Sequence, residues 1–126
     1  MFDWKNFLKT AEFMHKTVDE FPDREACYRT VVSRAYYAAF KLSVNYVSNK
    51  YNTKFFSNEH KEVQVFFKKK KHDNAMTKIG SQLTRLHQDR KKADYDEDMN
   101  ESAAMKAAKS LRTAQSIIEG IDALSS

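Results

Sequence analysis

The sequence predicts an all-α protein, an up-and-down bundle of about five helices with one long central helix. Its 126 residues include only two glycines and one proline, while Ala, Lys, Glu, Met and Leu are frequent, and such a composition favours helices joined by short connections. Apolar residues also recur at helical spacing in several separate segments. A chain of this length buries about two thirds of its unfolded surface as one domain, so residues 1–126 are expected to form a single helical domain.

The first helix is expected from residue 3 to about residue 20, with Asp3 as its cap. Its apolar stripe consists of Trp4, Phe7, Leu8, Ala11, Met14 and Val18. Pro22 ends this helix and opens the next one. The next helix runs from Asp23 to about Asn49 and is apolar on two sides, which is typical of the central helix of a bundle. A narrow polar strip lies between those sides and consists of Thr30, Arg34, Lys41 and Asn45.

Residues 50–57 predict a loop, and Ser57 is the expected cap of a short third helix that ends near Phe67. The lysine run that follows marks a solvated connection. A fourth helix then extends to about Lys92, with an apolar stripe of Met76, Ile79, Leu83 and Leu86.

An acidic connection is expected from Asp94 to Asn100. Asp98 and Glu101 have the spacing of a capping box, which predicts the start of the last helix. That helix presents a small-residue face suited to close packing, made of Ala104, Ala107, Ala108, Leu111, Ala114, Ile118 and Ile121.

Charge, cysteine content and hydrophobicity limit the ligands and the cellular location that are expected. The net charge of +5 and the isoelectric point near 9.3 permit contact with nucleic acid or nucleotide without demanding it. The single Cys27 is expected to be a small core residue and suits a reducing compartment. No apolar run approaches the roughly 18 residues of a membrane helix, so we expect a cytoplasmic protein without a membrane partner.

Metal and cofactor binding are not expected. The four histidines have no paired ligand spacing and the lone cysteine belongs to no cluster. Both glycines lie within helical patterns, so a glycine-rich phosphate loop is excluded.

The most informative stretch runs from Ser33 to Lys41 and reads SRAYYAAFK. Arg34 and Lys41 are separated by about 700° around a helix, about 20° short of two turns, so they share one face. Tyr37 lies about 60° from that line. A second island, RKKADY at residues 90–95, echoes the first one.

These two segments resemble the HEPN superfamily of small helical proteins, whose ribonucleases carry an Arg and, four to six residues later, a His. Arg34 matches the motif Arg, and the signature positions are matched by Tyr36, Tyr37, Ala38, Asp94 and Tyr95. The resemblance implies a helical bundle that commonly forms a homodimer, with the motifs of two subunits around a shared cleft. It also implies metal-independent ribonuclease chemistry in defence or toxin–antitoxin systems, and pairing of small members with a minimal nucleotidyltransferase.

Lys41 stands where the motif has its His. The pKa of a lysine amine is about 10.4 and that of a histidine about 6.5, so at pH 7 the amine is a fixed cation. Such a cation binds phosphate but shuttles protons poorly, and loss of general acid–base help costs about 10²–10⁴ in rate. We therefore expect a HEPN-like protein of a defence or toxin–antitoxin system that binds RNA, a nucleotide or a partner protein, with a degenerate ribonuclease motif.

Two alternatives remain. One is an active metal-independent ribonuclease toxin that uses Arg34 with Lys41, His60 or Tyr37. The other is a structural subunit of a larger defence complex, in which the polar strip only orders the core.

The environment of Arg34 has two interpretations. In one, Arg34 pairs with Asp94 in the interior, beside Tyr37 or Tyr95, and aligns the second and fourth helices, because an unpaired buried charge is costly. In the other, the strip contacts phosphate or RNA at a groove or dimer seam. Arg90 and Asp94 lie four residues apart and can instead pair within their own helix, which would leave Arg34 free.

The roles of the histidines and of the lysine run are considered next, and two of them have alternative interpretations. His60 is either a solvated first-turn residue or approaches the strip and replaces the missing proton carrier. His87 is expected at the surface. The run Lys68, Lys69, Lys70 and Lys71 is either a solvated loop or a footprint for nucleic-acid phosphates. Nearby aromatic residues can stack on bases. For Phe55 and Phe56, however, we expect a role in closing the bundle.

Overall fold

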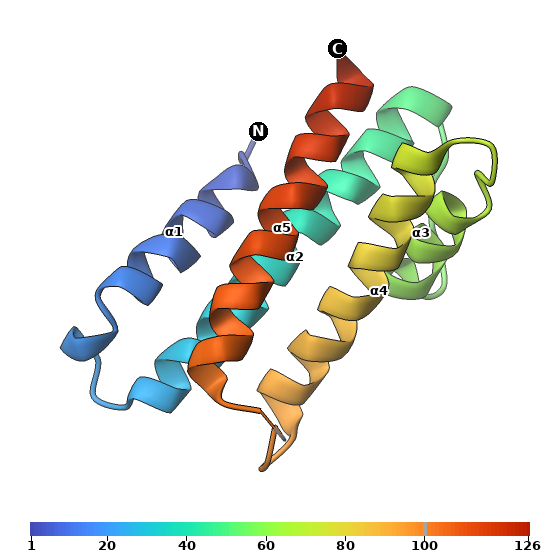
Figure 1. The fold of residues 1–126 in the computed structure, drawn as a ribbon. Coiled ribbons are helices and arrows are strands. Elements are labelled where there is room, and N and C mark those ends of the chain that lie inside the picture. The colour runs from blue at the N-terminus through green and yellow to red at the C-terminus, as the bar shows by residue number, and fades with distance from the viewer. Residues whose placement is uncertain (100) are drawn as a thin grey trace.

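The computed structural model describes residues 1–99 and 101–126, and within these ranges it contains helices and no strand. The helices are α1 (Lys5–Lys16), α2 (Arg24–Tyr51), α3 (Glu59–Lys68), α4 (Asn74–Tyr95) and α5 (Ala103–Ser125), with a 3₁₀ turn, η1 (Val18–Glu20), between the first two (Figure 1). The prediction of an all-α bundle of about five helices is confirmed.

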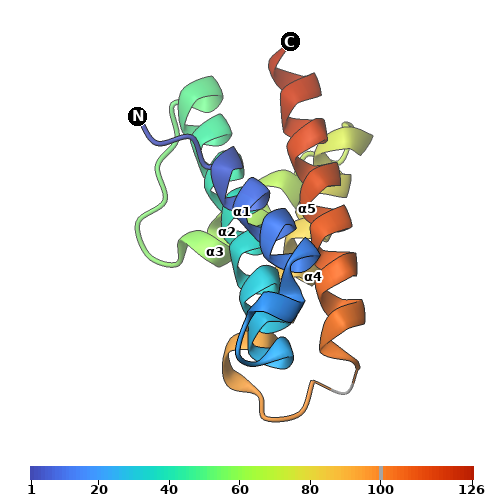
Figure 2. The ribbon, with the colours of Figure 1, turned by 90° about the vertical axis from the view of Figure 1, so that its left-hand side faces the viewer.

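The long helix α2 is the centre of the bundle, because it packs against each of the four other helices. Its buried side chains lie on two sides, as the sequence pattern predicted, and include Val31, Tyr36, Phe40 and Val47. Figure 2 views the bundle from the side of α1, with α2 and α5 behind it. Burial on two sides leaves only a narrow face of α2 for polar residues, and this face carries the candidate site.

Three helix ends differ from the expected positions. Helix α4 continues to Tyr95 rather than ending at about Lys92, so Asp94 belongs to this helix and not to the acidic connection. The first helix ends at Lys16 rather than near residue 20, because Thr17 leaves the helical region (φ −113°, ψ 26°) and η1 follows. The second helix continues to Tyr51 and ends at Asn52, whose φ of 51° is left-handed. Asparagine tolerates this conformation better than most residues, so the longer helix ends without a glycine.

Two predicted caps are wrong by a few residues. Asn58, not Ser57, caps α3 by accepting a hydrogen bond from the backbone N–H of Lys61 at 3.2 Å. Ser102, not Asp98, caps α5 by accepting from the backbone N–H of Met105 at 3.0 Å. In both cases the true cap stands immediately before the first helical residue. Asn100, the expected end of the acidic connection, lies outside the described residues.

Two expectations about burial and membranes can be compared directly with the structure. Cys27 is buried, as predicted for a core residue. Among the described helices, none combines the length and the apolar character needed to span a bilayer.

At Gly80, α4 packs tightly against the end of α3. A Cβ atom there would lie 2.8 Å from Cγ of Lys68, 3.0 Å from its backbone nitrogen and 3.1 Å from Cβ of Phe67. Because the backbone of α3 cannot move away cheaply, Gly80→Ala is expected to lower the free energy of unfolding by about 1–3 kcal/mol, despite the better helix propensity of alanine.

Urea unfolding of the two glycine variants measures this effect. Gly120→Ala is the matched control, since its Cβ would meet side-chain atoms of Ile79 at 3.2 and 3.3 Å and no backbone. A loss at Gly80 no larger than that at Gly120 would show that α3 can shift freely.

Candidate functional site

Arg34 does not form the interior ion pair with Asp94 that one interpretation of the sequence required. It lies on the exposed face of α2. The partner of Asp94 is Arg90, whose Nε lies 3.1 Å from the carboxylate Oδ2 within α4. The local pair forms because four residues along a helix place the two side chains side by side, and Arg34 is therefore left facing outward.

Two cations of α2 lie against aromatic rings, which belong to α1, to the residue just before α1 and to α2 itself. The guanidinium carbon of Arg34 lies 4.9 Å from the ring centroid of Phe7. The amine of Lys41 lies 5.5 Å from the Trp4 ring and 5.6 Å from the Phe40 ring. Within the described part of the chain, neither cation forms an ion pair. Arg34 is exposed and Lys41 is half-buried. Ring contacts of about 0.5–1 kcal/mol position such cations without neutralising them.

Tyr37 connects α2 to α4. Its hydroxyl accepts a hydrogen bond from Nη2 of Arg90 at 2.5 Å, and the Arg90 guanidinium lies 5.1 Å from its ring. We call the face formed by Arg34, Tyr37 and Lys41 the α2 strip. Asp94 compensates much of the charge of Arg90, so the uncompensated charge of the α2 strip comes from Arg34 and Lys41.

A stack of rings lies beside the α2 strip, and we call it the Tyr–His cluster: Tyr36, Phe40, His60 and His87. His60 stacks on Phe40 at 4.2 Å and on His87 at 5.0 Å between ring centroids. Its ring also meets the edge of Tyr37 at 6.1 Å. The Tyr36 hydroxyl lies 2.5 Å from Nδ1 of His60. His60 thus packs within the Tyr–His cluster and is not a solvated first-turn residue.

A hydrogen-bonded amide lies beside the ring of His87. Oε1 of Gln64 lies 2.9 Å from the Thr84 hydroxyl, which also lies 3.1 Å from the carbonyl oxygen of Gly80. The amide nitrogen of Gln64 lies 3.0 Å from Nδ1 of His87. The contact between Gln64 and His87 joins α3 to α4 beside the other rings of the cluster.

Both histidines of the cluster are neutral at pH 7. Burial is the first cause that lowers the pKa of His60, and the Arg90 and Lys41 charges add to it against the opposing effect of Glu59. Burial, with the neighbouring His60, Lys91 and Arg90, lowers the pKa of His87 to about 4. Burial also raises the pKa of Tyr36 well above its usual range, with Arg90 opposing it, so that side chain keeps its proton.

These shifts predict acid sensitivity. The folded-state pKa of His87 lies below its ordinary value of 6.5, so as the pH falls the unfolded chain takes up a proton at His87 before the folded protein does. The stability that neutral His87 contributes is complete above pH 6.5. It decreases by about 1–2 kcal/mol as the pH falls toward 4, after allowance for solvent screening.

Urea unfolding between pH 7 and pH 5 measures this loss. His87→Gln is expected to flatten the profile in that window, whereas His72→Gln in the exposed α3–α4 connection is expected to leave it unchanged. A wild-type profile that stays flat from pH 7 to pH 5 would contradict the burial of the cluster.

The remaining predicted site residues lie apart from the α2 strip. Asn45 lines a separate groove of about 500 Å³ between α2 and the end of α5, together with Lys5 and Asp122. Tyr95 is 74% exposed, with its ring centroid 5.8 Å from the guanidinium of Arg90.

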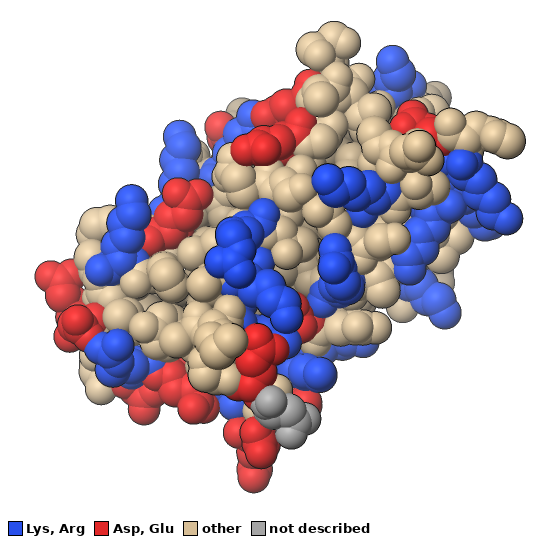
Figure 3. Space-filling model, in the orientation of Figure 1, with Lys and Arg blue, Asp and Glu red and all other residues tan. Residues whose placement is uncertain are grey.

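The lysine run surrounds the end of α3. Lys68, Lys69 and Lys71 are exposed, and Figure 3 shows Lys and Arg side chains gathered on this side of the molecule. The amine of Lys70 instead packs over two rings, 4.7 Å from that of Tyr51 and 4.8 Å from that of Phe66.

Sequence reasoning missed His87 and Gln64. His87 was expected at the surface, but it is half-buried in the Tyr–His cluster. A helical signal for it exists, because His87, Arg90 and Asp94 follow one another at the three- and four-residue spacing of one face. For Gln64 no sequence signal is evident, since its role depends on how closely α3 packs on α4.

In residues 1–99 and 101–126, no group of three His, Cys, Asp or Glu side chains is placed to hold a metal ion. No protein-family model matches the chain, and neither does any curated protein or solved structure. The function is therefore inferred from the geometry of the α2 strip and the Tyr–His cluster.

Proposed function

We propose that the protein is a HEPN-like domain of a defence or toxin–antitoxin system that binds RNA through the α2 strip and carries a degenerate ribonuclease motif. One observation supports this most strongly: Arg34 and Lys41 present two ring-backed cations on one face of α2, and no carboxylate of the described residues pairs with either. Uncompensated cations on a rigid helix suit the phosphates of a nucleic acid.

The spacing of the two cations suits a strand rather than a single phosphate. Seven residues of α-helix rise about 10 Å, so Arg34 and Lys41 contact separate phosphates of one RNA. Tyr37 lies between them with its hydroxyl held by Arg90. Binding through phosphates is tolerant of sequence and sensitive to salt.

Weak or absent cleavage follows from the chemistry of position 41. A permanently charged amine stabilises charge on a phosphate but neither removes a proton from the 2′-hydroxyl nor returns one to the leaving group at pH 7. The motif therefore retains the phosphate-binding arginine at position 34 and lacks a proton carrier at position 41.

An active metal-independent ribonuclease is the second candidate, and the position of His60 favours it. This imidazole lies beside Tyr37 of the α2 strip, and its lowered pKa keeps it neutral and able to accept a proton at pH 7. In this case Arg34 stabilises the phosphate charge and His60 replaces the absent motif His. Loss of residual cleavage in His60→Gln would distinguish this candidate from binding alone.

The proposal includes a homodimer in which two α2 strips face a shared cleft. Phe2 is 53% exposed and packs against Trp4 and Phe7, the rings that back the two cations. An apolar surface at this place suits contact with a second copy. A minimal nucleotidyltransferase or a larger defence protein is the other proposed partner, and a nucleotide is the other proposed ligand.

Fluorescence anisotropy with a labelled single-stranded RNA 20-mer tests the proposal, at a fixed salt concentration of about 0.1 M. The double variant Arg34→Ala/Lys41→Ala is expected to bind about tenfold more weakly than the wild type. Lys16→Ala/Arg112→Ala removes the same charge from α1 and α5 and is the matched control. Equal losses in both variants, or no binding by the wild type, would leave the α2 strip with a structural role only.

A further inference from the structure

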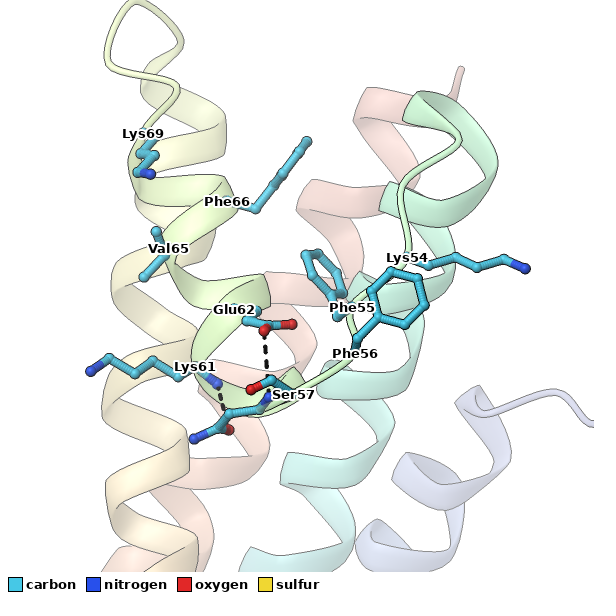
Figure 4. Close-up of a pocket in the computed structure, with 10 residues that line it drawn as sticks. Lys54, Phe55, Phe56, Ser57, Lys61, Glu62, Val65, Phe66 and Lys69 are labelled. Carbon is cyan, nitrogen blue, oxygen red and sulfur yellow. Dashed lines mark hydrogen bonds between the residues drawn. The ribbon is translucent and has the colours of Figure 1, made fainter.

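A concave surface lies between α3 and the loop of residues 52–58 (Figure 4). We call it the α3 groove. It has a volume of about 590 Å³, and its lining includes Lys54, Phe55, Phe56, Lys61, Glu62 and Lys69.

Aromatic side chains give the α3 groove its apolar character. Phe55 and Phe66 meet with their ring centroids 6.3 Å apart, and both pack against the main core. Phe56 was expected to close the bundle, but it is 89% exposed and lines the α3 groove, as Figure 4 shows. A freely exposed ring next to an apolar hollow is a stacking platform for a flat ligand.

The rim of the α3 groove is cationic. Three lysines border it, namely Lys54, Lys61 and Lys69, and further lysines follow at Lys70 and Lys71. This charge complements a ligand with negative groups on its outside. Phosphates on both sides of an apolar base meet that requirement.

Glu62 is the one carboxylate in the lining of the α3 groove. Its Oε1 accepts a long hydrogen bond of 3.4 Å from the backbone N–H of Asn58, so it retains capacity to accept further bonds. A carboxylate beside an apolar platform accepts from the N–H groups on the Watson–Crick edge of a base. The three lysines and the single Glu62 therefore complement a base that carries N–H donors and is flanked by phosphates.

The α3 groove and the α2 strip are near neighbours along the chain. His60 belongs to the Tyr–His cluster beside the strip, and the next two residues, Lys61 and Glu62, line the groove. The cluster beside the strip and the α3 groove therefore share the first turn of α3.

We propose that the α3 groove is a base-binding subsite for single-stranded RNA. One unpaired base stacks on Phe56 and donates hydrogen bonds to Glu62, while the flanking phosphates contact Lys54, Lys61 and Lys69. Guanine, with donors at N1 and N2, fits the carboxylate better than uracil. The choice of RNA rests on the proposed function.

The test uses labelled RNA pentamers of sequence UUGUU and UUUUU and the full chain. Phe56→Ala is expected to weaken binding of UUGUU about tenfold, and Phe56→Tyr is expected to restore it because the ring is kept. Glu62→Gln is expected to abolish the preference for UUGUU over UUUUU. Phe13→Ala removes another exposed ring, on α1, and is expected to change nothing.

Unchanged binding of UUGUU by Phe56→Ala would overturn the subsite, and so would tighter binding of a peptide rich in Glu and Phe. The two proposals fail separately. If the 20-mer still needs Arg34 and Lys41 while the pentamer ignores Phe56, the subsite is wrong and the α2 strip stands. If the pentamer needs Phe56 while the 20-mer ignores both cations, the strip is wrong and the subsite stands.

Discussion

Lys41→His is expected to raise metal-independent cleavage of single-stranded RNA by about 100-fold over the wild type. The substitution places an imidazole two helical turns from Arg34, on the same face of α2, with an ordinary pKa near neutrality. One group then stabilises charge on the phosphate while the other transfers a proton. The gain is placed at the lower end of general acid–base catalysis because the surrounding residues are adapted to an amine.

Release of a quenched fluorophore from labelled RNA, in the presence of EDTA, measures this gain. Lys41→Gln removes the charge without supplying a proton carrier and is the matched control, with no gain expected. Arg34→Ala in the Lys41→His background is expected to abolish the new activity. A wild-type rate that the histidine variant does not exceed would contradict the assignment of position 41.

Lys106→Met is expected to lower the free energy of unfolding by about 2–3 kcal/mol. The side chain of Lys106 is only 6% exposed, and its amine lies 3.0 Å from carboxylate oxygens of both Asp89 and Glu101. Removal of the cation leaves two carboxylates facing each other between α4 and α5. Loss of one partner of a buried pair costs about 3–5 kcal/mol, and the partial exposure of both carboxylates reduces that figure.

The charge state of Lys106 supports this expectation. Burial by itself would lower the pKa of Lys106, but hydrogen bonds to Asp89 and Glu101 outweigh burial and raise it above the ordinary value of 10.5. The stabilisation is therefore fully present below pH 10.5 and is lost only as the pH rises through the folded-state pKa. At neutral pH the ion pairs are intact.

Urea unfolding at pH 7 measures the effect of the Lys106 substitution. Lys109→Met is the matched control, because its amine is half exposed and lies 3.8 Å from Glu101, so its loss is expected to stay below about 0.5 kcal/mol. Adding Asp89→Leu to Lys106→Met is expected to recover part of the loss. Equal losses at positions 106 and 109 would show that this network does not join α4 to α5.

The sequence predicted the helices well because their signals are local. Apolar spacing, the proline after the first helix and the scarcity of glycine each act within a few residues, and the two-sided apolar pattern correctly predicted that α2 is central. Helix ends and caps were less accurate, as at Asn58 and Ser102, because several polar residues near each end have similar capping ability.

Contacts between helices were predicted less well. Whether Asp94 pairs with Arg34 or Arg90 depends on how α2 and α4 are rotated, and helical spacing alone left both open. The burial of His87 likewise depends on the approach of α3 to α4 at Gly80, and the exposure of Phe56 depends on the path of a loop. These properties arise from packing between elements, and local spacing, such as that of His87, Arg90 and Asp94 on one helical face, does not determine them.

The central claim is that Arg34 and Lys41 each neutralise a phosphate of bound RNA. The most direct test is the slope of the logarithm of the association constant against the logarithm of the salt concentration, measured for the wild type and for Arg34→Ala/Lys41→Ala. Each phosphate contact to a single strand contributes about 0.7 to the slope, so the double variant is expected to show a slope shallower by about 1.4. An unchanged slope would contradict the claim.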